Sequence, residues 1–141
     1  MNFVAGEISD RYWNEIKTKA NKRGIGFHLD PADAWKVFIF QSKKCAITGK
    51  KLEFISSGYR GSASLDRIDS HKPYTRHNVQ WVLAEINVMK GRHSMEYFKL
   101  LCEMVVRPTA DIVVSQQRSI PGTKEMAALN GYGTPGELVY R

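Results

Sequence analysis

A carboxylate and an amide lie at positions where their oxygens could bind one metal ion. Asp66 is near the end of residues 63–69, whose alternating pattern predicts a β-strand. Asn87 lies in the predicted helix that follows a connection, residues 70–77, and a second strand, residues 79–82. Because a strand–strand–helix unit of this length folds back on itself, we expect the two oxygens to converge. Hard oxygen ligands suit Mg²⁺, or a related divalent cation such as Mn²⁺, and a single negative ligand leaves most of the ion's charge available for a phosphodiester.

Helical patterns stand on both sides of these strands and would pack around them. Ser9 is a candidate N-cap for one helix, and Asp30-Pro31 is a typical start for the next. After the second strand, one helix is expected to end at Gly91 and another to begin after Ser94. The order helix, helix, strands, helix, helix predicts the α+β class, with packing helices at both ends of a central hairpin.

The remaining segments carry turn and loop signals. Residues 45–54 predict a short hairpin or strand edge, and residues 56–62 predict a loop. Proline and glycine are dense in residues 107–141, which predicts an extended or mobile C-terminal arm with at most a short helix at residues 124–129. We therefore expect residues 1–106 to form the folded domain.

Composition limits the class of protein. The chain has 141 residues, of which 43% are hydrophobic, so it is long enough for one domain with a real core. No apolar stretch approaches the ~18 residues of a membrane span, and the N-terminus lacks a secretory pattern, so we expect no membrane partner and a cytoplasmic location. The net charge of +7 favours an anionic partner such as nucleic acid.

Cysteine and tryptophan positions predict structural roles. Cys45 and Cys102 cannot supply a cysteine-rich zinc cage, so we expect no structural zinc and interpret both as buried thiols. Trp13, Trp35 and Trp81 fall on apolar faces and are expected in the core.

Several short motifs follow one another in a specific order. They are CAITG, ASLDRIDS, NVQWV, INVMKG and FKLLC, preceded by the helical segment KANKRGIGFHLDPADAWKVFIFQSKKC. From about Glu7 to Val106 the chain thereby resembles the phage-type HNH endonucleases of the ββα-metal class. The resemblance implies a central ββα-metal hairpin and metal-dependent hydrolysis of phosphodiester bonds in DNA by a one-metal mechanism, in a bacterial or phage-infected cell.

The resemblance also implies roles for individual residues. Asp66 and Asn87 would hold the metal ion. Asn78 would orient the loop between the strands through hydrogen bonds to the backbone, and Lys90 would contact phosphate. All four residue types also occur in ordinary structural positions, as turn residues, polar helix residues or charges near a helix end.

Arg67 departs from the family pattern, in which a histidine follows the acidic metal ligand and acts as the general base. An arginine cannot normally accept a proton, because its pKa exceeds ~12. One interpretation is that Arg67 binds the scissile phosphate while Asp69, His71 or His77 activates the water. A second is that water acts without a dedicated base. The third is a non-catalytic DNA-binding module, and an RNA-directed nuclease or binder is a further alternative.

Overall fold

The computed structural model describes residues 1–54 and 61–109. The chain divides into two compact units, Met1–Leu100 and Leu101–Arg141. Most of the predicted loop at residues 56–62 and the arm beyond residue 109, including the predicted helix at residues 124–129, lie outside the described residues.

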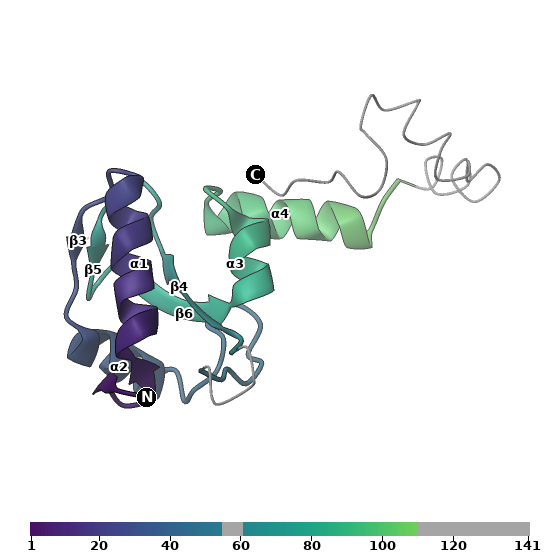
Figure 1. Cartoon of the computed structure of the whole chain (residues 1–141). Helices are drawn as coiled ribbons and strands as arrows, with labels where there is room; N and C mark the ends of the chain where they lie inside the picture. Colours follow the sequence, from purple (N-terminus) through teal and green to yellow (C-terminus); the bar gives the residue numbers. More distant parts are fainter. Residues whose placement is uncertain (55–60, 110–141) are drawn as a thin grey trace, which may run out of the picture. The chain divides into compact units, whose positions relative to one another are not determined.

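The described residues form an α+β fold in which small strand pairs are combined with helices (Figure 1). β1 pairs with β2 and β4 pairs with β6, both antiparallel, while β3 and β5 pair in parallel. The elements in chain order are β1 (Phe3–Ala5), β2 (Ile8–Ser9), α1 (Asp10–Lys22), β3 (Phe27–His28), α2 (Pro31–Phe40), β4 (Ala63–Arg67), β5 (Tyr74–Thr75), β6 (Val79–Leu83), α3 (Ala84–Lys90) and α4 (Met95–Val106).

Side-chain caps start the helices where the sequence predicts them. The Ser9 hydroxyl accepts a hydrogen bond from the Tyr12 backbone N–H at 3.2 Å, and the Asp30 carboxylate accepts one from the Ala32 N–H at 2.7 Å. The Ser94 hydroxyl caps α4 in the same way, through the Tyr97 N–H at 3.2 Å. All four predicted helices are confirmed, and the division between the two units falls inside α4.

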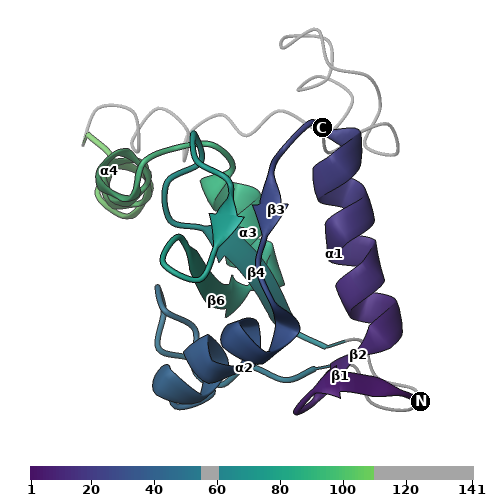
Figure 2. The ribbon, with the colours of Figure 1, turned by 90° about the vertical axis from the view of Figure 1, so that its left-hand side faces the viewer.

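The antiparallel pair β4–β6 leads directly into α3, which packs against both strands (Figures 1 and 2). Its register places Leu65 opposite Trp81 and Asp66 opposite Gln80. Because successive side chains of a strand point to opposite faces, Asp66 lies on the face covered by α3, whereas Leu65 lies in the core on the other face. The first predicted strand is two residues shorter than expected, because it ends at Arg67.

The predicted connection at residues 70–77 contains a strand that sequence analysis missed. Tyr74 of β5 pairs with Phe27 of β3, and the Tyr74 N–H donates to the Gly26 carbonyl at 2.9 Å. Strands of two residues have no periodicity to detect, so only the folded chain shows this pairing. The predicted hairpin at residues 45–54 is reduced to a turn with a single β-bridge between Lys44 and Lys51.

The core is built around Trp81, which is fully buried. Its indole N–H donates to the Ala34 carbonyl of α2 at 2.8 Å, and its ring lies 5.0 Å from that of Phe54. Trp13 is buried and Trp35 is partly buried against the same cluster, which confirms the predicted core role of the tryptophans. None of the helices in the described residues is long and apolar enough to cross a membrane.

The two cysteines differ in their surroundings. Cys45 is buried, and its Sγ accepts hydrogen bonds from the backbone N–H groups of Thr48 and Leu83 at 3.4 and 3.3 Å. Burial alone would raise the pKa of this thiol, but these bonds and one from the Thr48 hydroxyl outweigh it and bring the pKa below its ordinary value. The prediction of a buried thiol is confirmed for Cys45 and is wrong for Cys102, which is half-exposed.

Gly6 has a positive φ of 51° and no room for a side chain. A Cβ at this position would lie 2.0 Å from the Trp35 ring, whereas Gly49, with a φ of 71°, has nothing within 4 Å. We expect Gly6→Ala to destabilise the protein by about 1–3 kcal/mol more than Gly49→Ala, because both variants carry backbone strain but only the first overpacks the core. Urea unfolding of both variants measures the difference, and equal losses would contradict it.

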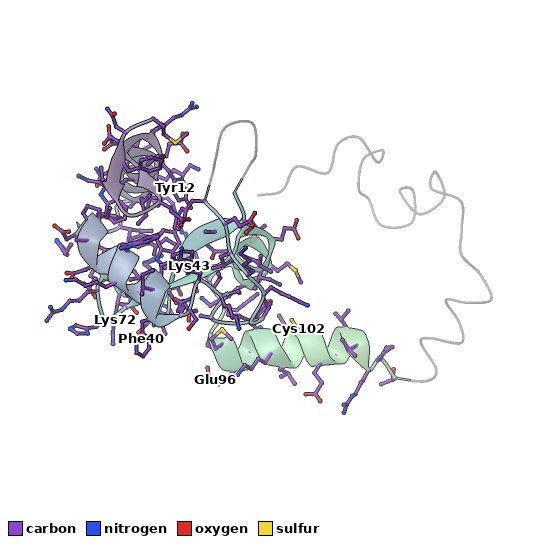
Figure 3. All side chains as sticks on the ribbon, turned by 90° about the horizontal axis from the view of Figure 1, so that it is seen from below. Tyr12, Phe40, Lys43, Lys72, Glu96 and Cys102 are labelled. Atoms are coloured by element: carbon purple, nitrogen blue, oxygen red, sulfur yellow. The ribbon has the colours of Figure 1, made fainter. Side chains whose placement is uncertain are left out.

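Tyr12 points from α1 into the fold, where its hydroxyl donates to the Ala63 carbonyl of β4 at 2.8 Å (Figure 3). Burial raises the pKa of Tyr12 to about 12, and Glu15 and Tyr74 contribute to the increase. A raised pKa means that the folded state holds this proton more tightly. The stabilisation that the protonated Tyr12 hydroxyl gives the folded state is therefore fully present below about pH 10. It is lost as the pH rises through about 12.

Tyr12→Phe is expected to lower the free energy of unfolding by about 1 kcal/mol near neutral pH, through loss of the hydrogen bond. The difference from wild type should shrink as the pH rises above about 10, because only the wild type loses the protonated hydroxyl. Urea unfolding at several pH values tests this. A difference that stays constant across the alkaline range would count against it.

Candidate functional site

Asp66 and Lys90 form a buried ion pair between β4 and α3. The Lys90 ammonium lies 3.2 Å from both Asp66 oxygens and also donates to the Arg67 carbonyl at 3.2 Å. Gln80 of β6 donates a further hydrogen bond to Asp66 Oδ2 at 3.0 Å. Lys90 is 0% exposed and Asp66 is 6% exposed. The carboxylate is thus both neutralised and screened from solvent.

Asn87 lies one helical turn before Lys90 and contacts the same face of β4. Its amide nitrogen donates to the Ser64 hydroxyl at 2.8 Å and to the Leu65 carbonyl at 3.3 Å. Among the described residues, no hydrogen bond is donated to its amide oxygen. Ser64 and Asp66, two positions apart on β4, therefore share one face, and Asn87 and Lys90 of α3 contact that face.

The donor chemistry of this face fits a hard divalent cation. It offers the carboxylate of Asp66 and the free amide oxygen of Asn87, and the Lys90 ammonium already stands beside the carboxylate as a positive charge. A divalent cation would have to take the place of that ammonium. The described residues contain no group of three or more His, Cys, Asp or Glu side chains that could hold a metal, so any such site depends on the amide.

Lys90 does not occupy the position expected for a phosphate contact. Its ammonium is turned inward to Asp66, with no exposed surface. In this arrangement of the chain, Lys90 serves as the counter-ion of Asp66. The sequence places a lysine near the end of a helix, where exposure is usual, and so gives no sign of this burial.

Arg67 points to the face of β4 opposite Asp66. One guanidinium nitrogen, Nη1, donates to the Lys72 carbonyl at 2.9 Å, and the group lies 5.4 Å from the centre of the Tyr74 ring. Arg67 is only 9% exposed, and no carboxylate of the described residues lies within ion-pair distance of it. The structure therefore separates Arg67 from the Asp66 and Asn87 face, although the sequence places it next to Asp66.

Asn78 makes the backbone hydrogen bonds that the resemblance implies. Its amide oxygen accepts from the Asp69 N–H at 2.9 Å, and its amide nitrogen donates to the Asp69 and Pro73 carbonyls, both at 3.0 Å. The side chain is buried. It ties both ends of the loop between β4 and β5 to the start of β6.

The candidate general bases lie on or beside this loop and are largely exposed. Asp69 accepts a hydrogen bond from the His71 backbone N–H at 2.9 Å, which lowers the pKa of the carboxyl, and the nearby Lys72 ammonium acts in the same direction. The His71 side chain is 91% exposed, and His77 accepts a hydrogen bond from Arg76. In the part of the chain that is described, none of the three candidates forms a hydrogen bond or ion pair with Asp66 or Asn87.

Sequence reasoning missed Gln80 and the grouping of Arg23 and Arg92 with Arg67 around one pocket. Gln80 follows from hairpin register, because it lies opposite Asp66 on the neighbouring strand. Arg23 and Arg92 come from distant parts of the chain, and no local signal groups them with Arg67.

Compared with known proteins, the chain matches no protein-family model, no curated sequence and no solved structure.

Proposed function

We propose that the protein is a metal-dependent DNA endonuclease whose β4, β6 and α3 form a ββα-metal hairpin. The observation that supports the proposal is that Asp66 of β4 and Asn87 of α3 lie on the same face of β4. The basic net charge of +7 supports a nucleic-acid substrate. The choice of DNA over RNA rests on the resemblance to the HNH endonucleases.

In the proposed mechanism, Asp66 and Asn87 would hold Mg²⁺ through one carboxylate and one amide oxygen. The bound ion would stabilise charge on the phosphate and on the leaving oxygen. Lys90 would have to release Asp66 for this carboxylate to serve as a ligand, and the hydrogen bond from Gln80 would keep the carboxylate oriented. Asp69, with its pKa held low, is weakly basic, and His71 lines the pocket on the face of β4 opposite Asp66, so the proposal assigns no side chain as the general base.

Cleavage of supercoiled plasmid tests the proposal. Wild type is expected to cut in Mg²⁺ or Mn²⁺ and to stop when a chelator is added. Asn87→Ala should lower the cleavage rate at least about tenfold, because it removes one of only two ligands. Asn14→Ala, on the exposed face of α1, is the matched control and should cut at the wild-type rate. Equal rates for Asn87→Ala and wild type would show the metal assignment to be wrong.

A second candidate is a non-catalytic DNA-binding module with the same hairpin. The observation that favours it is the buried Asp66–Lys90 ion pair, which neutralises the carboxylate without a metal. Salt-sensitive binding to duplex DNA with no cleavage in either cation would support this candidate over the first. Competition by single-stranded DNA and by RNA identifies the preferred nucleic acid.

A further inference from the structure

A basic pocket lies on the face of β4 opposite Asp66. Its volume is about 520 Å³, within the range of small-ligand sites. Among residues 1–54 and 61–109, no aspartate or glutamate lines it. Asp69, just outside the lining, is 3.6 Å from the Lys72 ammonium and neutralises part of that charge. The charged and titratable side chains of the lining are Arg23, His28, Arg67, His71, Lys72 and Arg92.

Arg67 is the buried cation of this pocket and has no anionic partner among the described residues. Buried charges are normally paired, because an unpaired charge loses its hydration without compensation. Every fully buried side-chain nitrogen or oxygen of the described residues has a hydrogen-bond partner, yet Nε and Nη2 of Arg67 have none. These two nitrogens therefore retain access to solvent, and the pocket is the space that Arg67 lines.

The walls of the pocket are held in place by the backbone. The Tyr74 N–H bonds to the Gly26 carbonyl, and a Cβ at Gly26 would lie 3.0 Å from Pro73, so the two walls are in close contact. The Lys72 carbonyl holds Arg67 at 2.9 Å, while Asn78 ties the loop at Asp69 and Pro73. The Lys72 side chain itself extends outward from this loop (Figure 3).

We propose that this pocket binds a phosphate group of a nucleic acid, with Arg67 as its main ligand. A guanidinium with two unbonded nitrogens suits a phosphate because it donates parallel hydrogen bonds. Arg23 and Arg92, both exposed at the rim, add charge without a carboxylate partner among the described residues. Because Arg67 and Asp66 face opposite sides of β4, the bound phosphate is a different one from the phosphate that would be cleaved at Asp66. The identification of a nucleic acid rests on the proposed function, whereas phosphate binding itself does not.

Titration with inorganic phosphate in the absence of divalent cations tests the pocket directly, with chloride at the same ionic strength as the reference. Arg67→Met should weaken phosphate binding at least tenfold. Arg76→Met, an exposed arginine outside the pocket, removes the same charge and should leave binding unchanged. Arg92→Gln, at the exposed rim, should weaken binding severalfold and keeps the test valid if Arg67→Met folds poorly. Equal phosphate affinity in Arg67→Met and Arg76→Met, or in Arg92→Gln and wild type, would overturn the proposal.

Oligonucleotides with and without a 5′-phosphate then identify the source of the phosphate. Tighter binding of the phosphorylated strand, lost in Arg67→Met, assigns the pocket to a terminal phosphate. Equal binding of both strands, weakened in Arg67→Met, assigns it to the phosphodiester backbone. If Arg67→Met changes the affinity for neither oligonucleotide, a nucleic-acid ligand is refuted. Asn87→Ala should keep full phosphate affinity, so loss of cleavage and loss of phosphate binding are separate results.

Discussion

Lys90→Met is expected to destabilise the protein by about 3–5 kcal/mol, measured by urea unfolding. The substitution retains most of the buried aliphatic volume but leaves the Asp66 carboxylate buried without its counter-ion. Lys36→Met, on the exposed face of α2, makes the same change in charge and should cost less than about 1 kcal/mol. A loss below about 1 kcal/mol for Lys90→Met would mean that the ion pair does not hold α3 against β4.

The effect of Mg²⁺ on the stability of Lys90→Met tests the metal assignment. With the ammonium removed, a divalent cation can neutralise Asp66 without competition, so Mg²⁺ should stabilise Lys90→Met more than it stabilises wild type. An ion at about 100 times its dissociation constant would add about 2.7 kcal/mol. Adding Asn87→Ala to Lys90→Met should reduce that gain, because the amide ligand is lost. The same small response to Mg²⁺ in all variants would contradict a metal site at Asp66.

Local signals were sufficient to predict the helices and the central strand pair. The Ser9 and Asp30 caps each satisfy an N–H group of the first helical turn, and this chemistry depends on residues that are close in sequence. Trp81 was predicted in the core because it falls on an apolar face of the predicted strand, and it is fully buried. The loop-orienting role of Asn78 was implied by the family resemblance, and its hydrogen-bond partners Asp69 and Pro73 are near neighbours in the chain.

Long-range contacts account for what the sequence could not predict. The pairing of β3 with β5 joins two-residue segments separated by α2 and β4, and it builds one wall of the basic pocket. The burial of Lys90 depends on how closely α3 approaches β4, which no pattern within α3 records. For the same reason, alternation along β4 separates the side chains of Asp66 and Arg67, although motif reasoning treats them as one site.

Asn78→Ala should lower the free energy of unfolding by about 3 kcal/mol, because three buried hydrogen bonds of about 1 kcal/mol each are lost together. Asn14→Ala, which loses one exposed hydrogen bond, is the control and should lower the free energy of unfolding by less than about 1 kcal/mol. Asn78→Ala should also weaken phosphate binding in the basic pocket, since the loop that it ties carries the Lys72 carbonyl that positions Arg67. Urea unfolding and phosphate titration measure the two effects separately. Reduced stability with unchanged phosphate affinity would show that the loop holds Arg67 without help from Asn78.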